Sequence, residues 1–132
     1  MPIALASRAN LRILLVEDHD DSRAMMVRLL GSAGYAVVAA MGYADALAKA
    51  QGGAFDVLIA DLGLPDGSGW ELPRRLREEC RFAAIAVSGH GTPADIERSR
   101  SAGYCDHLTK PINFEQLLAT VADCHKREST AA

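Results

Sequence analysis

The sequence predicts an α/β domain built on an open, doubly wound, parallel sheet of five strands, and three observations lead to this fold class. Five short apolar runs alternate with amphipathic stretches along the chain. The apolar runs are continuous and do not alternate with polar residues, which indicates strands buried on both faces. The chain has 132 residues, the length of one domain. Helices must therefore cover both faces of one sheet, and right-handed crossovers place them there.

Each predicted strand is followed by a predicted helix. The strands are expected at 11–16, 36–40, 56–60, 83–87 and 105–108. The helices are expected as a pattern through 26–33 and then at 43–51, 68–79, 93–101 and 114–126. Residues 1–10 and 128–132 fall outside this pattern, and we expect them to be flexible ends of a domain that covers 11–127.

Several residues mark the ends of the predicted helices. Gly34 lies where the C-terminal glycine of a helix belongs. Ser68, Thr92 and Asn113 each begin a capping box, with an acid or amide three residues later. Pro73 lies past the first turn if Ser68 is the N-cap, so we expect that helix to be kinked or to begin later.

Composition and charge exclude several classes of protein. A net charge of −3 and a pI near 5.7 argue against nucleic-acid binding through a basic surface. The longest stretch without a charge or strong polar break, 33–44, is too short to cross a membrane, and the N-terminus lacks a secretion signal. The three cysteines are widely spaced and include no CxxC. We therefore expect no zinc site and no disulfide framework, but reduced, buried thiols in a cytoplasmic protein.

Polar residues follow four of the five predicted strands. The first strand is followed by Glu17, Asp18, Asp20 and Asp21, and the third by Asp61. The fourth strand is followed by Ser88 and the fifth by Lys110. In an open α/β sheet, ligands bind beyond the carboxyl ends of the strands. We therefore expect these side chains to converge at one edge.

The convergence of carboxylates predicts a metal-assisted reaction at phosphorus. Glu17, Asp18 and Asp61 would repel one another unless a cation lies among them. Mg²⁺ suits carboxylates, a carbonyl and waters, because it prefers oxygen ligands in octahedral geometry. A carboxylate beside such an ion can attack phosphorus, since the ion and a nearby ammonium offset the charge of the phosphoryl oxygens. We therefore predict an aspartyl phosphate on Asp61, with Ser88 and Lys110 contacting the phosphoryl oxygens.

Structural explanations exist for most of these residues taken singly. Glu17 and Asp18 could be acids favoured by the dipole at a helix N-terminus, and Asp20 and Asp21 are assigned that role. The Ser-Gly pair at 88–89 is common in turns, and the Lys-Pro pair at 110–111 is a bond type in which cis peptides occur. Asp61 has no such explanation, because an unpaired charge at the end of a buried strand is costly. The residues taken together support the prediction of an aspartyl phosphate on Asp61, although most of them would not support it singly.

Four motifs in order resemble the receiver domain of two-component response regulators. They are Ile-Leu-Leu-Val-Glu-Asp at 13–18, Asp-Leu-Gly-Leu-Pro-Asp-Gly-Ser-Gly at 61–69, Ala-Val-Ser-Gly-His-Gly at 86–91 and Leu-Thr-Lys-Pro at 108–111. The resemblance covers about residues 10–126. It implies a flavodoxin-like fold of five β-α units with strand order 2-1-3-4-5.

The resemblance also implies partners, a cofactor and residue roles. A histidine kinase or histidine phosphotransfer protein would donate a phosphoryl group to Asp61. Asp18, Asp61 and the main-chain carbonyl of Gly63 would bind Mg²⁺ directly, with Glu17 reaching it through water. Ser88 would swing toward the phosphoryl group, which Lys110 would contact. A two-state rearrangement would then reach a protein-binding face made by the fourth helix, the fifth strand and the fifth helix.

Three positions depart from the family pattern. Glu17 stands where Asp is commoner, which a role through water tolerates. His107 occupies the switch position three residues before Lys110, where Tyr or Phe is usual. Gly63 offers no side chain to shield an acyl phosphate from water. His107 and the stretch 96–103 resemble receivers at the C-terminus of hybrid histidine kinases, so we expect either a stand-alone receiver or part of such a kinase, with no output domain in this chain.

Two other functions would use similar residues. A haloacid-dehalogenase-like phosphatase acts on small molecules through an aspartyl intermediate, but it uses a second Asp two residues after the nucleophile, where this chain has Gly63. A pseudo-receiver acts as an interaction module without phosphorylation, whereas this chain keeps the acids, Ser88 and Lys110. We therefore expect a signalling phosphoacceptor that assists its own phosphorylation and dephosphorylation, not a turnover enzyme.

Overall fold

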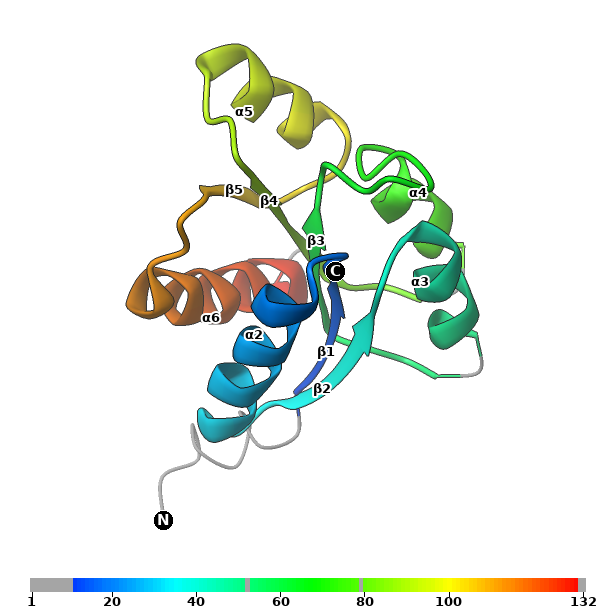
Figure 1. Ribbon diagram of the computed structural model, residues 1–132, viewed down its shortest axis with the longest axis vertical. Helices are drawn as coiled ribbons and strands as arrows, with labels where there is room; N and C mark the ends of the chain where they lie inside the picture. The colour runs from blue at the N-terminus through cyan, green and yellow to red at the C-terminus, as the bar shows by residue number, and fades with distance from the viewer. Residues whose placement is uncertain (1–10, 52, 79, 131–132) are drawn as a thin grey trace.

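The fold is a single parallel sheet with helices on both faces. The computed structural model describes residues 11–51, 53–78 and 80–130. Its strands are β1 (Arg12–Val16), β2 (Ala36–Ala40), β3 (Val57–Asp61), β4 (Ala83–Ser88) and β5 (Asp106–Thr109). They are ordered β2-β1-β3-β4-β5 (Figure 1). The predicted fold class and the strand order implied by the resemblance are both confirmed.

Helices in the described residues alternate with the strands. They are α2 (Asp20–Ser32), α3 (Tyr43–Ala50), α4 (Leu72–Leu76), α5 (Pro93–Ser101) and α6 (Phe114–Thr130). Side chains of α2 and α6 pack on one face of the sheet, and side chains of α3 and α4 pack on the other. Among the described residues, no helix is long and apolar enough to cross a membrane.

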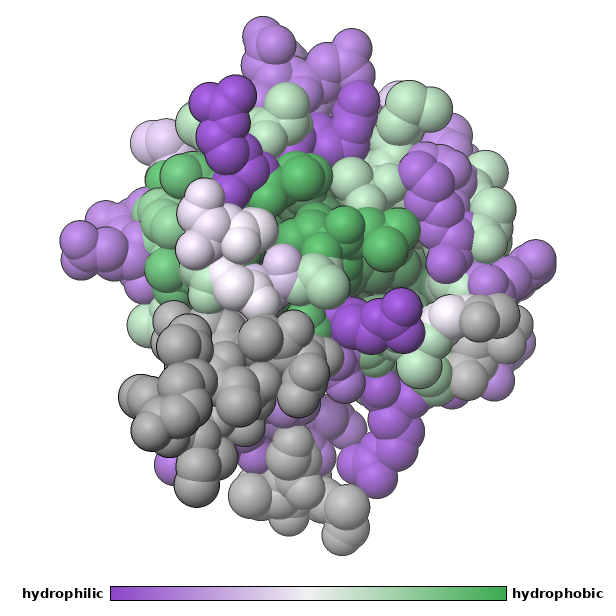
Figure 2. Space-filling view, turned by 90° about the horizontal axis from the view of Figure 1, so that it is seen from below, coloured by the Kyte–Doolittle hydropathy of each residue, from purple (hydrophilic) through white to green (hydrophobic). Residues whose placement is uncertain are grey.

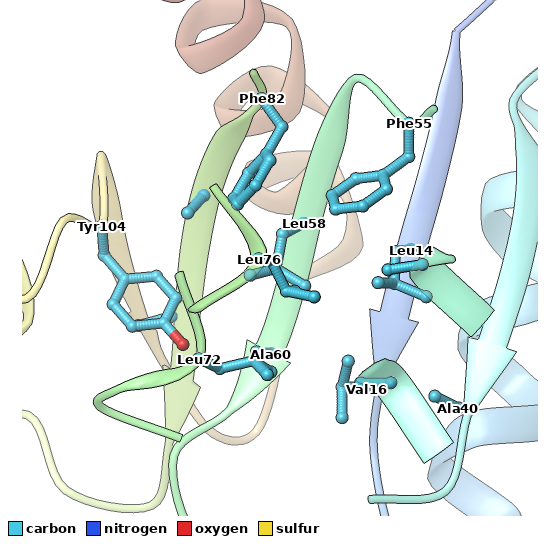
Figure 3. Close-up of a cluster of buried hydrophobic side chains, with 14 of the residues drawn as sticks. Leu14, Val16, Ala40, Phe55, Leu58, Ala60, Leu72, Leu76, Phe82 and Tyr104 are labelled. Atoms are coloured by element: carbon cyan, nitrogen blue, oxygen red, sulfur yellow. The ribbon is translucent and has the colours of Figure 1, made fainter. Parts of the chain in front are cut away.

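Burial on both faces explains the continuous apolar runs of the central strands. Every residue of β3 and β4 is buried. Leu58 and Ala60 of β3 point toward α3 and α4, whereas Val57 and Ile59 point toward α2 and α6. In the core between the sheet and the helices α3 and α4, the rings of Phe55 and Phe82 lie with their centroids 4.7 Å apart (Figure 3). Buried strands of this kind hold the residues after their carboxyl ends in fixed positions.

The two ends of the sheet present different surfaces. Figure 2 shows the molecule from below, toward the amino ends of β1 and β3. Hydrophobic residues are visible at the centre of this view and hydrophilic residues surround them. The acids predicted to bind a metal lie at the carboxyl ends of β1 and β3, the opposite end of these strands.

The predicted helix starts are confirmed except for one. Thr92 accepts a hydrogen bond from the Asp95 backbone N–H, and Asn113 accepts one from that of Gln116. Ser68 is not an N-cap, because α4 begins at Leu72 with Pro73 in its first turn. A proline there forfeits no helical hydrogen bond, so the later start that Pro73 predicted is confirmed.

Other local expectations also have outcomes in the structure. Gly34 has a φ of 102°, a conformation that glycine adopts without a Cβ penalty. The peptide bond between Lys110 and Pro111 is cis. Helix α4 ends at Leu76, before the predicted 79, and α6 continues to Thr130, past the predicted 126. Residues 1–10 and 131–132 lie outside the described part of the chain.

The expectation of three reduced thiols is wrong for two cysteines. Cys105, just before β5, and Cys124 of α6 form a disulfide. Their Cα atoms lie 6.0 Å apart, a usual separation for a disulfide. The packing of α6 beside β5 creates this proximity, which a sequence separation of 19 does not reveal. Cys80 is a free, partly buried thiol.

Candidate functional site

The structure gathers three predicted acids at the carboxyl ends of β1 and β3. Carboxylate oxygens of Glu17, Asp18 and Asp61 all lie within 4.8 Å of one another. Glu17 and Asp61 are buried, whereas Asp18 is exposed. Asp20 and Asp21 occupy the first turn of α2, as their structural assignment predicted, and Asp20 pairs with Arg23. The acid cluster therefore consists of the residues that were assigned to metal binding.

One lysine partly neutralises this cluster. The Nζ of Lys110 lies 2.7 Å from Oδ2 of Asp61 and 3.3 Å from Oε1 of Glu17. The backbone N–H of Lys110 donates to the Ser88 carbonyl, which fixes the residue beside β4. Burial by itself would lower the pKa of Lys110, but the hydrogen bond and charge of Asp61, together with Glu17, outweigh burial and raise it. The ammonium is therefore held in its charged form.

The Glu17 carboxyl has a raised pKa. Burial raises its pKa, and the nearby charge of Asp61 raises it further. The His19 backbone N–H, 3.0 Å from Oε2, and the Lys110 ammonium oppose this shift without cancelling it. The ionised cluster contains three negative charges against one ammonium. A divalent cation with oxygen ligands fits this set of donors and would offset the surplus.

Asp61 is positioned by the loop that follows it. Its Oδ1 accepts a hydrogen bond of 2.8 Å from the Gly63 backbone N–H. A Cβ at Gly69 would lie 2.7 Å from the Asp61 carbonyl oxygen, so only glycine allows the loop to return this closely. The exposed Asp66 carboxylate accepts hydrogen bonds from the backbone N–H groups of Tyr43 and Ala44, which ties the loop to the start of α3. Gly63 therefore lies beside Asp61.

Ser88 and Asp61 line one pocket. Trp70, His90 and Asp95 also line it, which leaves space beside the Asp61 carboxylate that is open to solvent. The Ser88 Oγ lies 2.8 Å from Nε2 of His107 and within hydrogen-bond distance of the His90 carbonyl oxygen. The Ser88 hydroxyl thus donates to the His90 carbonyl, and its oxygen lies next to Nε2 of His107.

His107 connects Ser88 with α5. Its Nε2 lies 3.2 Å from the His90 carbonyl oxygen as well as near Ser88. On its other side, Nδ1 lies 3.1 Å from the Oγ of Ser99. Tyr104, the nearby aromatic residue, is buried and its hydroxyl donates to the Gly69 carbonyl, so it does not occupy the position of His107.

The sequence interpretation did not single out Ser99 or Asp66. Ser99 is buried in a helix that otherwise consists of exposed or partly buried residues, and Asp66 anchors a loop through backbone contacts. A serine within a polar helix and an aspartate within a Gly/Pro-rich loop are both ordinary at those places. No signal in the sequence distinguishes them, because their partners are 8 and 23 residues away.

The family follows from comparison with known proteins. The model of the response regulator receiver domain matches residues 13–122. The chain belongs to this family. It is similar to solved receivers such as the CheY-like receiver domain protein of Methanospirillum hungatei JF-1, with a TM-score of 0.83 and 27% identity over 92% of this chain and 98% of that one. It is also similar to the chemotaxis protein CheY4 of Vibrio cholerae, with a TM-score of 0.81 and 32% identity over 86% of this chain and 98% of that one.

Relatives with longer chains carry the same domain. The transcriptional regulatory protein HprR of Escherichia coli is 31% identical over 84% of this chain and 50% of its own length. The virulence sensor protein BvgS of Bordetella pertussis is 36% identical over 83% of this chain and 10% of its own. The chain thus spans half of the first relative and a small part of the second. It is a receiver domain of the two-component systems, similar to receivers of both response regulators and sensor kinases.

Proposed function

We propose that Asp61 accepts a phosphoryl group from a phosphohistidine of a histidine kinase or histidine phosphotransfer protein. One Asp61 oxygen attacks the phosphorus, the bond from phosphorus to the histidine nitrogen breaks, and the leaving imidazole takes up a proton. The observation that supports this most is the placement of Asp61: a buried carboxylate, 2.7 Å from the Lys110 ammonium, at the side of an open pocket. The Lys110 ammonium would contact a phosphoryl oxygen and offset its charge.

The same site would bind Mg²⁺. Asp18, Asp61 and the Gly63 carbonyl would be direct ligands, with Glu17 acting through water. Bound there, the ion would offset charge on the phosphoryl oxygens during transfer. The cluster's surplus of negative charge supports this assignment, and so does the raised pKa of the Glu17 carboxyl. A similar response regulator from Burkholderia pseudomallei, with a TM-score of 0.80 and 25% identity over 93% of this chain and 74% of that one, is described with a phosphorylated aspartic acid and a calcium ion.

Signalling would follow from movement of Ser88 and His107. In the present structure the Ser88 hydroxyl donates to the His90 carbonyl, and its oxygen lies 2.8 Å from Nε2 of His107. A phosphoryl oxygen in the pocket would offer its hydroxyl a charged acceptor, which is a stronger partner than a neutral one. The resulting shift would reach the face formed by α5, β5 and α6, where we propose that a downstream protein binds.

Phosphorylation by acetyl phosphate tests the assignment of Asp61. With Mg²⁺, intact mass spectrometry should show one added phosphoryl group, and the fluorescence of Trp70, which lines the pocket, should change. Asp61→Asn should abolish both effects. Asp21→Asn, an exposed acid in the first turn of α2, is the matched control and should leave both intact. An adduct that persists in Asp61→Asn would refute the assignment, and wild-type protein without any adduct would indicate a pseudo-receiver.

A further inference from the structure

Arg23 reaches from α2 to the backbone that joins this helix to β1. Its guanidinium Nη1 donates to the main-chain carbonyl of Glu17, at 3.0 Å, and to that of Asp18, at 3.4 Å. Its Nη2 donates to the Asp20 carboxylate. Because 18% of the Arg23 side chain is exposed, water competes little for these contacts. One side chain therefore holds two consecutive residues that follow β1, and both are predicted to serve the metal.

The three acids of the candidate metal site are not held equally. The carboxylates of Glu17 and Asp61 are buried, and Lys110 contacts both of them. Asp18 is exposed, and within the described part of the chain its carboxylate takes part in no hydrogen bond or ion pair. Its place beside the other two carboxylates therefore depends on its main chain, to which Arg23 donates.

The charge of Arg23 and its hydrogen bonds would affect a bound cation in opposite ways. A guanidinium near the acids repels Mg²⁺, so its charge alone would weaken binding. Its hydrogen bonds order the residues that supply the carboxylates, and binding to a site that is already ordered costs less conformational entropy. The Asp20 carboxylate offsets the charge by direct contact, and water screens this pair because 86% of the Asp20 side chain is exposed. We therefore expect the ordering of the backbone to outweigh the repulsion.

The arrangement of acceptors around Arg23 suits arginine and not lysine. A guanidinium is planar and its five N–H donors point in fixed directions, so two of its nitrogens can serve three separate oxygens. The three oxygens here belong to Glu17, Asp18 and Asp20. The substitution Arg23→Lys keeps the positive charge but leaves a single nitrogen on a flexible stem. It therefore removes the fixed hydrogen bonds without removing the charge.

We propose that Arg23 is a positioning residue of the metal site. It fixes the main chain of Glu17 and Asp18, so that the Asp18 carboxylate is in place before the ion binds. In this role the guanidinium contacts the backbone and not the ion. The inference rests on the proposed Mg²⁺ site and adds to it a residue of α2. Because the two effects are linked, Mg²⁺ should in turn stabilise the backbone that Arg23 holds.

A Mg²⁺ titration followed by the fluorescence of Trp70, which lines the pocket beside Asp61, tests this role. Arg23→Lys should raise the dissociation constant for Mg²⁺ about fivefold, the equivalent of one lost hydrogen bond. Arg23→Ala should raise it about tenfold, because relief of the repulsion recovers part of a larger loss. Arg28→Lys and Arg28→Ala change an exposed arginine of the same helix and are the matched controls, which should bind Mg²⁺ as the wild type does.

The sign of the change separates the two effects of Arg23. If its charge were what matters, Arg23→Lys would bind Mg²⁺ as the wild type does and Arg23→Ala would bind it more tightly. Either result would overturn the proposal, and so would equal weakening in the Arg28 variants. Arg23→Lys keeps the charge and most of the side-chain length, so the test does not depend on the folding of Arg23→Ala.

Amide hydrogen exchange of His19 distinguishes a positioning role from a general loss of stability. The His19 backbone N–H donates to Oε2 of Glu17, at 3.0 Å, and so reports on the backbone that Arg23 holds. In metal-free Arg23→Lys this amide should exchange about fivefold faster than in the wild type, while the amides of α6 keep their wild-type rates. Saturating Mg²⁺ should slow it again. Faster exchange throughout the chain, or an unchanged rate at His19, would overturn the proposal.

The wild-type titration separates failure of this inference from failure of the proposed function. A wild type that does not respond to Mg²⁺ would overturn the proposed metal site and, with it, any role for Arg23. A wild-type response that Asp18→Asn weakens and Arg23→Lys leaves unchanged would overturn the role of Arg23 and leave the metal site standing. Weaker binding in both variants, with the Arg28 controls unchanged, is the expected result.

Discussion

The two halves of the candidate site are held by different kinds of interaction. The acidic half, made of Glu17, Asp18, Asp61 and Lys110, contains charged groups joined by contacts of 2.7 and 3.3 Å. The hydroxyl half, made of Ser88, His107 and Ser99, contains polar groups that exchange hydrogen bonds at 2.8 and 3.1 Å. Charges in a buried cluster cannot separate without a large penalty, whereas a hydroxyl can turn between acceptors at little cost.

This difference separates chemistry from response. Lys110 and the backbone N–H groups of His19 and Gly63 hold the carboxylates of Glu17 and Asp61, so this geometry is suited to the proposed metal binding and attack on phosphorus. In the hydroxyl half, the single hydrogen of the Ser88 hydroxyl can reach two atoms, the His90 carbonyl oxygen and Nε2 of His107. A phosphoryl oxygen on Asp61 would add a third. The half that changes least is therefore suited to the reaction, and the half that changes most is suited to signalling.

The largest expected effect concerns the support of the hydroxyl half. The disulfide between Cys105 and Cys124 ties the start of β5, which carries His107, to α6. Reduction should lower the free energy of unfolding by about 3 kcal/mol, because the bond closes a loop of 19 residues in the unfolded chain. Urea denaturation with and without dithiothreitol measures this loss. Folded, reduced protein should still form the Asp61 adduct, because the acidic half does not contact either cysteine sulfur.

Cys105→Ala provides the control for the disulfide. Its stability should be independent of dithiothreitol, since no bond remains to reduce. Equal urea midpoints for oxidised and reduced wild-type protein would contradict the prediction. Loss of adduct formation on reduction, in protein that remains folded, would contradict the separation between the two halves.

The second effect concerns the charge balance of the acidic half. Lys110→Met leaves Glu17 and Asp61 without their cation, and the free energy of unfolding should fall by about 2 kcal/mol when no Mg²⁺ is present. The value is below that of a fully buried pair, because 35% of the Lys110 side chain is exposed. Added Mg²⁺ should restore more stability in this variant than in the wild type, since a divalent ion replaces the missing charge.

Thermal unfolding with and without Mg²⁺ measures the second effect. Lys126→Met, which changes a lysine of α6, is the matched control and should show the wild-type response to the ion. Equal responses in Lys110→Met and wild type would mean that the ion does not bind among these acids. Adduct formation in Lys110→Met should also slow by about 100-fold, because a donor to the phosphoryl oxygens is lost.

The smallest effect concerns Asp66, whose carboxylate ties the loop after β3 to the start of α3. We call this contact the loop clamp. Hydrogen bonds from the backbone of Tyr43 and Ala44 hold the pKa of Asp66 below its ordinary value of 3.8. The folded pKa is thus lower than the unfolded one. The clamp's contribution is present above pH 3.8 and is lost as the pH falls through the folded value. Asp66→Ala should therefore be less stable at neutral pH and lose less stability on acidification.

Acid titration of the free energy of unfolding, measured with urea, compares Asp66→Ala with the wild type. The steepness of the acid decline should decrease without disappearing, because the Met41 backbone N–H likewise lowers the pKa of Asp45. Asp123→Ala, an exposed acid of α6 that pairs with Arg127, is the control and should leave the decline near that of the wild type. Identical declines in Asp66→Ala and wild type would show that the clamp is not maintained in solution.

Local patterns were enough to locate the residues of the acidic half. Glu17 and Asp18 follow β1, Asp61 ends β3, and Lys110 follows β5. Their convergence could be predicted because parallel strands bring their carboxyl ends to one edge, whatever the details of side-chain packing. The number of strands could also be predicted from the sequence. A strand buried on both faces is a continuous apolar run, which can be recognised without knowing which strands it pairs with.

Contacts across elements could not be predicted in this way. The disulfide, the Asp66 clamp and the approach of Ser99 to His107 each join residues whose positions depend on how helices pack against the sheet. The start of α4 is an intermediate case. Pro73 predicted a later beginning than Ser68, and the return of the loop past Asp61 accounts for the residues in between.

By itself, the sequence determined the β-α order, the receiver motifs and the edge at which the acids meet. These properties depend on spacing along the chain and on the chirality of its crossovers. Only the tertiary structure decided that Lys110 bridges two acids, that Cys105 pairs with Cys124, and that His107 lies within hydrogen-bond distance of a buried serine of α5. Hydrogen bonds and disulfides form over a few ångströms, and distances that short between distant residues are set by packing.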